Sequence, residues 1–206
     1  MKGLSFTAPM VKAWLEGRKT VTRRLMKLQP DIIVGDQLQP NVWYAADKGD
    51  FAGDPDRQIK PRYRPGETVY IKETWAQFGL KNQSLRGKVN VIEYAADMGI
   101  ERFPIGGNFT PHKEDFKWKS PRFMPEWAAR SHALIVSVRP ERVQEISGFE
   151  AVLEGFGKGI PEFELLHYGG YKKARKEFIE TWESLHPGSW EKNEWCWRIE
   201  LNKEAE

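Results

Sequence analysis

Cysteine is almost absent from this sequence of 206 residues, in which Cys196 is the only one. A lone cysteine cannot form an intramolecular disulfide, and a zinc site built on paired cysteines is excluded. Proteins without disulfides are typical of a reducing compartment, so we expect a cytoplasmic location.

Long apolar runs are missing as well. No stretch approaches the roughly 20 apolar residues that a membrane-spanning helix needs. Near the N-terminus, Pro9 and Lys12 interrupt what would have to be the apolar core of a signal peptide. We therefore expect a protein that is neither embedded in a membrane nor exported by that route.

Histidine is scarce, and the histidines show no metal-ligand spacing. The four are His112, His132, His167 and His186. The sequence therefore predicts no metal site, and no motif in it indicates another cofactor.

Positive charge is in small excess overall but concentrated in one place. The formal net charge is +3. Between residues 18 and 27 the chain has five cations and no acidic residue: Arg18, Lys19, Arg23, Arg24 and Lys27. A cluster of this kind is most often a solvated surface. Its density also makes it a candidate nucleic-acid contact.

A short helix leads the chain to this cluster. Apolar residues recur at helical spacing between Thr7, a candidate N-cap, and Gly17, where we expect the helix to stop. The β-branched residues that follow favour a strand. Side chains alternate along a strand, so Lys19 and Thr22 meet only if the turn rotates Lys19 toward Thr22.

The remaining pattern predicts an α+β fold. Strands are expected over 68–75, 89–95, 131–138 with a break at Pro140, and 195–201. Helices are expected from a capping box at Ser147 and Glu150, and over 171–185. Two turn-rich segments without sustained periodicity, about 29–65 and 100–121, are predicted to be insertions. The prediction is a single domain over 1–206: a small mixed β-barrel with flanking helices and two long insertions.

The basic segment also resembles a family signature. Gly17, Lys19, Thr20, Thr22 and Arg24 match the Gly-x-Lys-Thr-x-Thr-x-Arg run of the ASCH family, a branch of the PUA-like barrels. The resemblance continues at 65–67, 143–147, 154–155 and 195–200, and with 124–128 and 188–190 the chain is most similar to longer members often encoded in phages and prophages. It implies a PUA-like barrel with a nucleic-acid or nucleoside ligand in a cleft beside the first helix.

In family members that resemble N4-acetylcytidine amidohydrolases, the functional trio is a lysine, a threonine and a glutamate. Lys19 and Thr22 match the first two by motif position, and Glu154 matches the third, with Glu150 one turn earlier as the alternative. The candidate residues for binding nucleic acid or substrate are Arg18, Thr20, Arg23, Arg24 and Trp75, the last as a ring for base stacking.

The trio has a chemical rationale of its own. A threonine hydroxyl is a poor nucleophile and needs a positioned base. Lys19 can act as that base only if its pKa falls, and we expect repulsion from Arg18, Arg23 and Arg24 and partial burial to lower it. A carboxylate such as Glu154 could then orient the substrate amine or protonate it as it leaves. Both an acyl-threonine intermediate and a directly activated water fit this arrangement.

Three functions follow from the sequence as hypotheses. The first is a hydrolase that acts on the amide of a modified cytidine such as N4-acetylcytidine. The second is an RNA-binding protein or ribonuclease that uses the same cleft, with DNA as an alternative ligand. The third is a non-catalytic, phage-encoded protein whose insertions bind a host protein. The sequence leaves the oligomeric state open.

Overall fold

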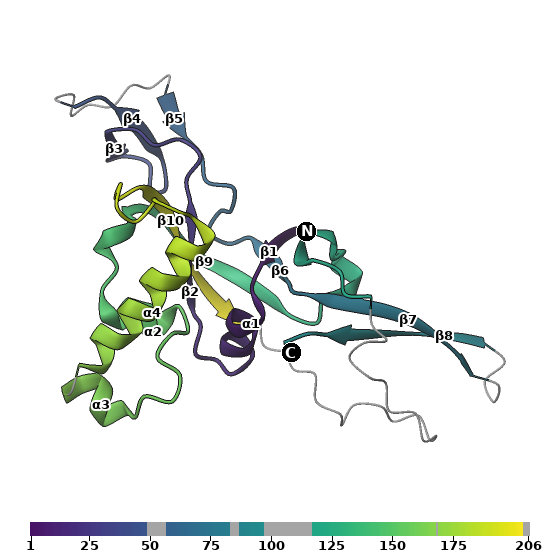
Figure 1. Ribbon diagram of the computed structural model, residues 1–206. Coiled ribbons are helices and arrows are strands. Elements are labelled where there is room, and N and C mark those ends of the chain that lie inside the picture. The colour runs from purple at the N-terminus through teal and green to yellow at the C-terminus, as the bar shows by residue number, and fades with distance from the viewer. Residues whose placement is uncertain (49–56, 83–86, 97–116, 168, 204–206) are drawn as a thin grey trace. The chain divides into compact units, whose positions relative to one another are not determined.

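The structure, a computed structural model, describes residues 1–48, 57–82, 87–96, 117–167 and 169–203 (Figure 1). The chain has a mixed α+β architecture with several sheets and few helices. It divides into two compact units, Met1–Glu16 with Thr68–Ala133 and Gly17–Glu67 with Leu134–Glu206. The prediction of a single domain stays a prediction.

The first unit combines a short helix with two pairs of strands. Strand β1 (Lys2–Ser5) runs parallel to β6 (Thr68–Lys72), and β7 (Trp75–Asn82) pairs with β8 (Gly87–Tyr94) in an antiparallel hairpin. Helix α1 (Ala8–Leu15) buries Trp14, whose indole N–H donates to Ser131 Oγ at 2.6 Å. The short 3-10 helices η3 (Pro121–Phe123) and η4 (Glu126–Ala128) complete the unit.

The second unit contains the basic segment. Strand β2 (Val21–Leu25) lies antiparallel to β10 (Trp195–Lys203), and β10 also borders β9 (His132–Arg142), of which all but the first two residues belong to this unit. A separate antiparallel sheet is formed by β3 (Ile32–Gly35), β4 (Trp43–Ala46) and β5 (Gln58–Ile59). The chain leaves β9 through the 3-10 helix η5 (Val143–Glu145).

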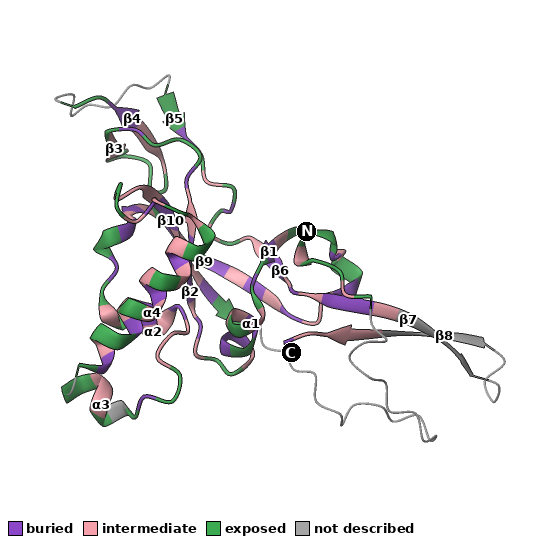
Figure 2. Cartoon of the chain, in the orientation of Figure 1, coloured by how far each residue is buried: buried purple, intermediate pink, exposed green. Residues whose placement is uncertain are grey.

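Three helices follow in the second unit: α2 (Gly148–Leu153), α3 (Glu162–His167) and α4 (Gly170–Leu185). Helix α4 is amphipathic, and Figure 2 shows buried and exposed residues alternating along it. Its buried stripe forms a core with residues of η5, α2 and β10 and with Ile146 before α2: Val143, Ile146, Ala151, Ala174, Phe178, Trp182 and Cys196. The contact between α2 and α4 is close, because a Cβ placed on Gly148 would lie 2.5 Å from the carbonyl oxygen of Tyr171.

Most local predictions are confirmed. Helix α1 has Thr7 as its N-cap and is followed by Gly17 in a left-handed conformation with φ of +74°. Both hydrogen bonds of the predicted capping box are present between Ser147 and Glu150. The longest helix in the described ranges has 16 residues, and none of the helices there combines the length and apolar character needed to cross a membrane.

Two predictions differ from the structure, and two of its features were not predicted. None of the sheets closes into a barrel within the described residues, because the strand order of each sheet runs from one edge strand to another. Strand β9 continues through Pro140, as a strand can where a ladder N–H is not required. The segment 29–65 contains the sheet β3–β5, and helix α3 was not predicted. Of the predicted insertion at 100–121, residues 100–116 lie outside the described residues.

Candidate functional site

The backbone of Thr20, next to Lys19, is held between α2 and β10. The N–H of Thr20 donates to the carbonyl of Leu153 at the end of α2, at 2.8 Å, and the carbonyl of Thr20 accepts from the N–H of Leu201 in β10, also at 2.8 Å. The left-handed turn at Gly17 releases the chain from α1 immediately before this segment. The Lys19 side chain then points toward the C-terminal end of α2, where Glu154 lies.

Lys19 and Glu154 form a closed ion pair there. The Lys19 ammonium donates to Glu154 Oε2 at 2.6 Å, to the Glu154 carbonyl at 3.0 Å and to the Val21 carbonyl at 2.8 Å. The residues are only 1% and 3% exposed. Three acceptors match the three N–H groups of an ammonium, so in this arrangement the lysine is charged and fully hydrogen-bonded.

The short helix α2 explains why Glu154 reaches this point. Its capping box fixes the start, and Glu154 is the C-cap, with its N–H donating to the Glu150 carbonyl at 2.9 Å. Gly155 follows with φ of +96°, a conformation that glycine adopts without strain. Glu150 lies one turn earlier, where its carboxylate pairs with Arg198 and Arg23, and Glu154 is the carboxylate that contacts Lys19.

Arg23 connects three glutamates beside this pair. Its Nε donates to Glu141 Oε1 at 2.5 Å, and its Nη1 donates to Glu154 Oε1 at 3.2 Å. Its Nη2 lies 3.0 Å from Glu150 Oε2 as an ion pair without hydrogen-bond alignment. The Arg23 side chain is fully buried. The basic segment therefore directs two of its cations inward to carboxylates, where the sequence predicted a nucleic-acid contact.

Burial dominates the electrostatics of Lys19. Desolvation lowers the pKa of its ammonium, the Glu154 carboxylate opposes that shift, and Arg24 and Arg23 add to it by repulsion. Arg18 was expected to contribute as well, but its guanidinium donates to the Gly155 carbonyl at 2.7 Å. The predicted direction of the shift is thus confirmed, with burial as its main cause.

The glutamates around Arg23 respond in opposite directions. Burial raises the pKa of Glu141, although Arg23 partly offsets this. Burial also disfavours ionisation of Glu150, but Arg23, the Ser147 N–H and Arg198 outweigh it, so the pKa of that carboxyl is lowered. Arg198 Nε donates to Glu150 Oε1 at 2.9 Å, which places Glu150 at the outer edge of the network.

The other predicted site residues have varied positions. Thr22 is 1% exposed in β2, in register with Ile199 and three residues along the chain from Lys19. Arg24 is half-buried, and burial lowers the pKa of its guanidinium, while Tyr63 and Glu154 act in the opposite direction. Thr20 acts through its backbone, as described above.

Trp75 belongs to the first unit and is 3% exposed. The Lys119 ammonium lies 4.5 Å from the centre of its ring, and Trp127 packs edge-on at 6.0 Å. Its packing with Met124 and Ala128 is that of a core residue. The ring would have to leave this packing before it could stack on a base.

Sequence reasoning missed Glu141 and Arg198. Glu141 is 118 residues from Arg23 along the chain, and nothing in the local pattern of β9 links the two. A partial signal existed for Arg198, because it alternates with apolar residues in a strand and so had to lie on the opposite face from Trp197. Of the carboxylates that neutralise the basic segment, Glu141 could be identified only from the fold.

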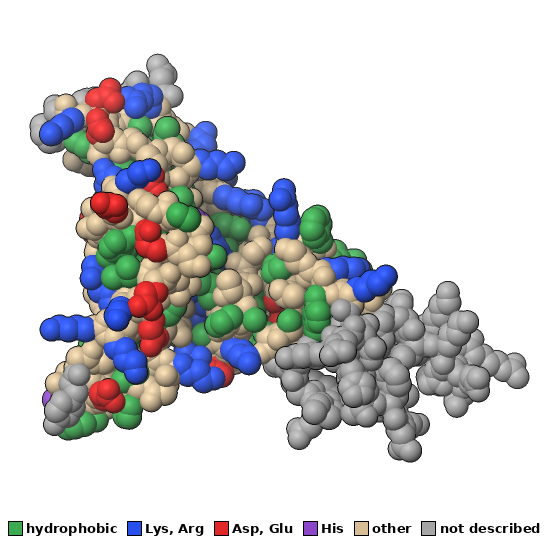
Figure 3. Space-filling model, in the orientation of Figure 1, with side chains coloured by type: hydrophobic (Ala, Val, Ile, Leu, Met, Phe, Trp, Pro, Cys, Tyr) green, Lys and Arg blue, Asp and Glu red, His purple; other side chains and the backbone are tan. Residues whose placement is uncertain are grey.

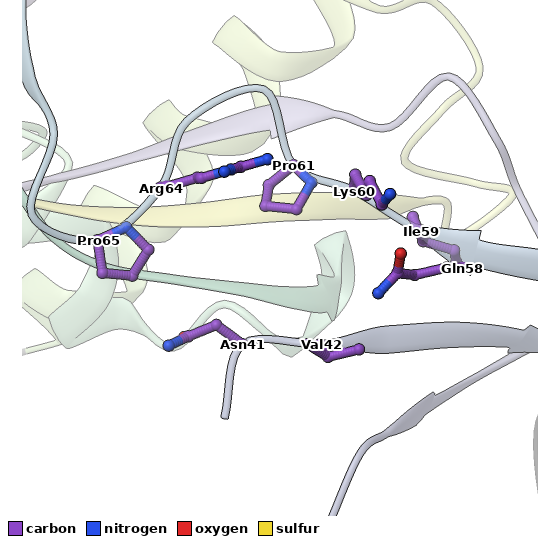
Figure 4. Close-up of a pocket in the computed structure, with 8 residues that line it drawn as sticks. All are labelled: Asn41, Val42, Gln58, Ile59, Lys60, Pro61, Arg64 and Pro65. Carbon is purple, nitrogen blue, oxygen red and sulfur yellow. The ribbon is translucent and has the colours of Figure 1, made fainter. Parts of the chain in front are cut away.

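Within the described residues, no group of three or more His, Cys, Asp or Glu side chains is arranged to hold a metal ion. Comparisons with protein-family models, with curated proteins and with solved structures found no match. A pocket described below lies in the second unit, between residues 41–42 and 58–65 (Figure 4). The buried Lys19–Glu154 pair places an amine and a carboxylate in contact, which are groups suited to acid–base chemistry.

Proposed function

We propose that this protein is a PUA-like, ASCH-type hydrolase that cleaves the amide of a modified cytidine such as N4-acetylcytidine. Lys19, Thr22 and Glu154 are its working residues. The observation that carries the proposal is the 2.6 Å contact between Lys19 Nζ and Glu154 Oε2, which joins residues 135 positions apart. The family resemblance selects the same lysine and the same glutamate.

The acylation step begins with a proton transfer inside the pair. Where water is excluded, a neutral amine beside a neutral carboxylic acid competes with the ion pair, because burial penalises both charges. The Lys19 amine takes the proton of Thr22 Oγ1 as that oxygen attacks the acetyl carbonyl carbon. Glu154 gives its proton to the cytidine nitrogen as the C–N bond breaks. Cytidine leaves, and the acetyl group remains on Thr22.

The deacylation step restores the starting state. Glu154, now a carboxylate, takes a proton from water as the water oxygen attacks the acetyl carbon. The Lys19 ammonium returns its proton to Thr22 Oγ1 as the ester bond breaks, and acetic acid leaves and ionises in water. Lys19 and Glu154 are then again a neutral pair, return of the Glu154 proton to Lys19 restores the ion pair, and one water molecule has been consumed.

Substrate entry requires movement, because the three side chains are only 1–3% exposed. The segment that follows Glu154 is suited to this, since Gly155, Gly157 and Gly159 all have positive φ values between 73° and 96°. In this proposal, displacement of residues 155–159 opens the pair to the substrate. Closure then excludes water, which strengthens the electrostatic interactions inside the site.

A second candidate function is nucleic-acid binding without chemistry. The observation that favours it is that all three N–H groups of the Lys19 ammonium have acceptors within 3.0 Å, as expected for a purely structural ion pair. In that case Lys19 and Glu154 stabilise the second unit, and any ligand binds elsewhere.

Turnover separates the two candidates. Purified protein is incubated with N4-acetylcytidine, and the release of cytidine and acetate is followed. Lys19→Met, Thr22→Val and Glu154→Gln should each abolish release, whereas Thr22→Ser keeps the hydroxyl and should retain it. Lys27→Met is the matched control, because Lys27 is an exposed lysine of the same basic segment.

Each remaining outcome selects another function. Absence of release at high enzyme concentration contradicts the amidohydrolase proposal. RNA cleavage that disappears in the same variants would instead identify a ribonuclease, and RNA binding without cleavage would identify a binding protein. Absence of turnover and of nucleic-acid binding would favour the interaction protein.

A further inference from the structure

The predicted insertion at 29–65 carries a second basic segment. Residues 57–64 contain four cations and no acidic residue: Arg57, Lys60, Arg62 and Arg64. All four are exposed, in contrast to Lys19 and Arg23. Several Lys and Arg side chains are visible below β5 in Figure 3. This segment therefore presents to solvent the positive charge that the first basic segment directs inward.

The fold fixes which side chains of the segment face outward. Ile59 pairs with Trp43 across β4 and β5, and both Ile59 and Tyr63 are 7% exposed. Trp43 in turn packs edge-on against Trp197 of β10, with ring centres 5.2 Å apart. The buried apolar residues anchor the segment, so the cations between them are held at the surface.

A pocket of about 210 Å³ lies beside these cations. Figure 4 shows it between the chain at Asn41 and Val42 and the segment that runs from Gln58 to Pro65. Two cations, Lys60 and Arg64, line it together with the side-chain amides of Asn41 and Gln58. The remaining lining is apolar: Val42, Ile59 and two prolines.

This combination matches the parts of a nucleotide. Side-chain amides offer both a donor and an acceptor, as base edges require. Apolar walls suit the faces of a planar ring, and the pocket is smaller than the roughly 300–1,000 Å³ typical of drug-sized ligands, which fits a single base. Lysine and arginine neutralise phosphate, with arginine able to bind it through two N–H groups.

The cations differ in what they already contact. Arg57 pairs with Asp47 at 3.0 Å, and the Arg62 guanidinium lies 5.4 Å from the centre of the Tyr63 ring. Lys60 and Arg64 are the cations that line the pocket. An acidic protein segment would satisfy the charges alone, but it would leave the amides and apolar walls without a matching group.

We propose that the pocket and residues 57–64 bind a single-stranded polynucleotide, with phosphates at Lys60 and Arg64 and one base in the pocket. This site lies on the sheet β3–β5 and is distinct from the Lys19–Glu154 pair. The proposal concerns binding alone and holds whether or not the protein hydrolyses an amide. Failure of the turnover assay and failure of this proposal are therefore separate results.

The test measures how binding depends on salt. Fluorescence anisotropy follows a labelled single-stranded RNA 12-mer, and a DNA 12-mer of the same sequence, over a range of salt concentrations. Each phosphate contact with a single strand contributes about 0.7 to the slope of log K against log salt. The slope should therefore fall by about 1.4 in the double variant Lys60→Gln, Arg64→Gln.

Two further variants control the measurement. Lys172→Gln with Lys173→Gln also removes two exposed positive charges, from α4, and should leave the slope unchanged. Lys60→Arg with Arg64→Lys keeps both charges and should keep the slope. An oligonucleotide that lacks its bases should bind more weakly than the intact one, because it leaves the pocket empty.

Several results would overturn the proposal. These are binding of neither oligonucleotide, an unchanged slope in the Lys60→Gln, Arg64→Gln variant, or an equal decrease in the α4 variant. Equal affinity for intact and abasic strands would show that no base binds in the pocket. Displacement of the RNA by polyglutamate of equal charge at the same concentration would identify an acidic protein partner instead.

Discussion

Replacing Lys19 with methionine tests the buried ion pair, because it removes the ammonium and keeps an apolar chain of similar length. Removing one partner of a buried pair costs about 3–5 kcal/mol, since the other charge stays buried. Here the Glu154 carboxylate keeps Arg23, whose Nη1 is 3.2 Å from Oε1. We therefore expect a loss near the lower end, about 3 kcal/mol in the free energy of unfolding.

Urea unfolding followed by tryptophan fluorescence measures this loss. The double variant Lys19→Met, Glu154→Gln removes both charges, so it should be more stable than Lys19→Met alone. A loss below about 1 kcal/mol for Lys19→Met, a value typical of an exposed pair, would refute the buried geometry. So would a double variant whose loss equals the sum of the two single losses, because residues in contact should not be additive.

Three further predictions concern the surroundings of the pair. Gly148→Ala should destabilise the protein by about 1–3 kcal/mol in thermal unfolding, because the added Cβ would meet the Tyr171 carbonyl. Gly35→Ala is the control and should cost less, because the nearest atom to its Cβ lies at 3.8 Å. Equal losses in the two variants would contradict the close contact between α2 and α4. The pKa of Glu150 is lowered in the folded protein, so its charge stabilises the fold above the ordinary value of 4.5 and that contribution is lost as the pH falls. Glu150→Gln should therefore reduce the urea midpoint at pH 7 more than at pH 3, and a pH-independent difference would exclude this linkage. Cys196 is buried, and burial raises the pKa of its thiol, so a thiol reagent should modify it only in denaturant. Rapid modification of the native protein would show that the core between α2, α4 and β10 is open.

Local signals in the sequence were sufficient for several elements. Thr7 and Gly17 delimit α1, and the Ser147–Glu150 capping box starts α2, because each of these features acts over a few residues. The resemblance to the ASCH signature paired Lys19 with Glu154, and their side chains are in contact in the structure, while their catalytic roles stay a prediction. The elements that could be predicted from the sequence were therefore those with local signals.

The sequence could not predict that Lys19 and Arg23 point into the protein and not toward solvent. A run of cations is solvated unless carboxylates elsewhere in the chain neutralise it, and Glu141, Glu150 and Glu154 are all more than 100 residues away from the run. The sheet β3–β5 was missed for a related reason. Its strands have two to four residues, too few to show the alternation that identifies a strand.

The rate of cytidine release from N4-acetylcytidine tests the central proposal most directly. The proposal requires release by the unmodified protein and by Thr22→Ser. It also requires a decrease of about 100-fold or more in Lys19→Met, since acid–base catalysis typically contributes about 100-fold to 10,000-fold. Release that is absent from the unmodified protein, or unchanged by Lys19→Met, would contradict a catalytic role for the Lys19–Glu154 pair.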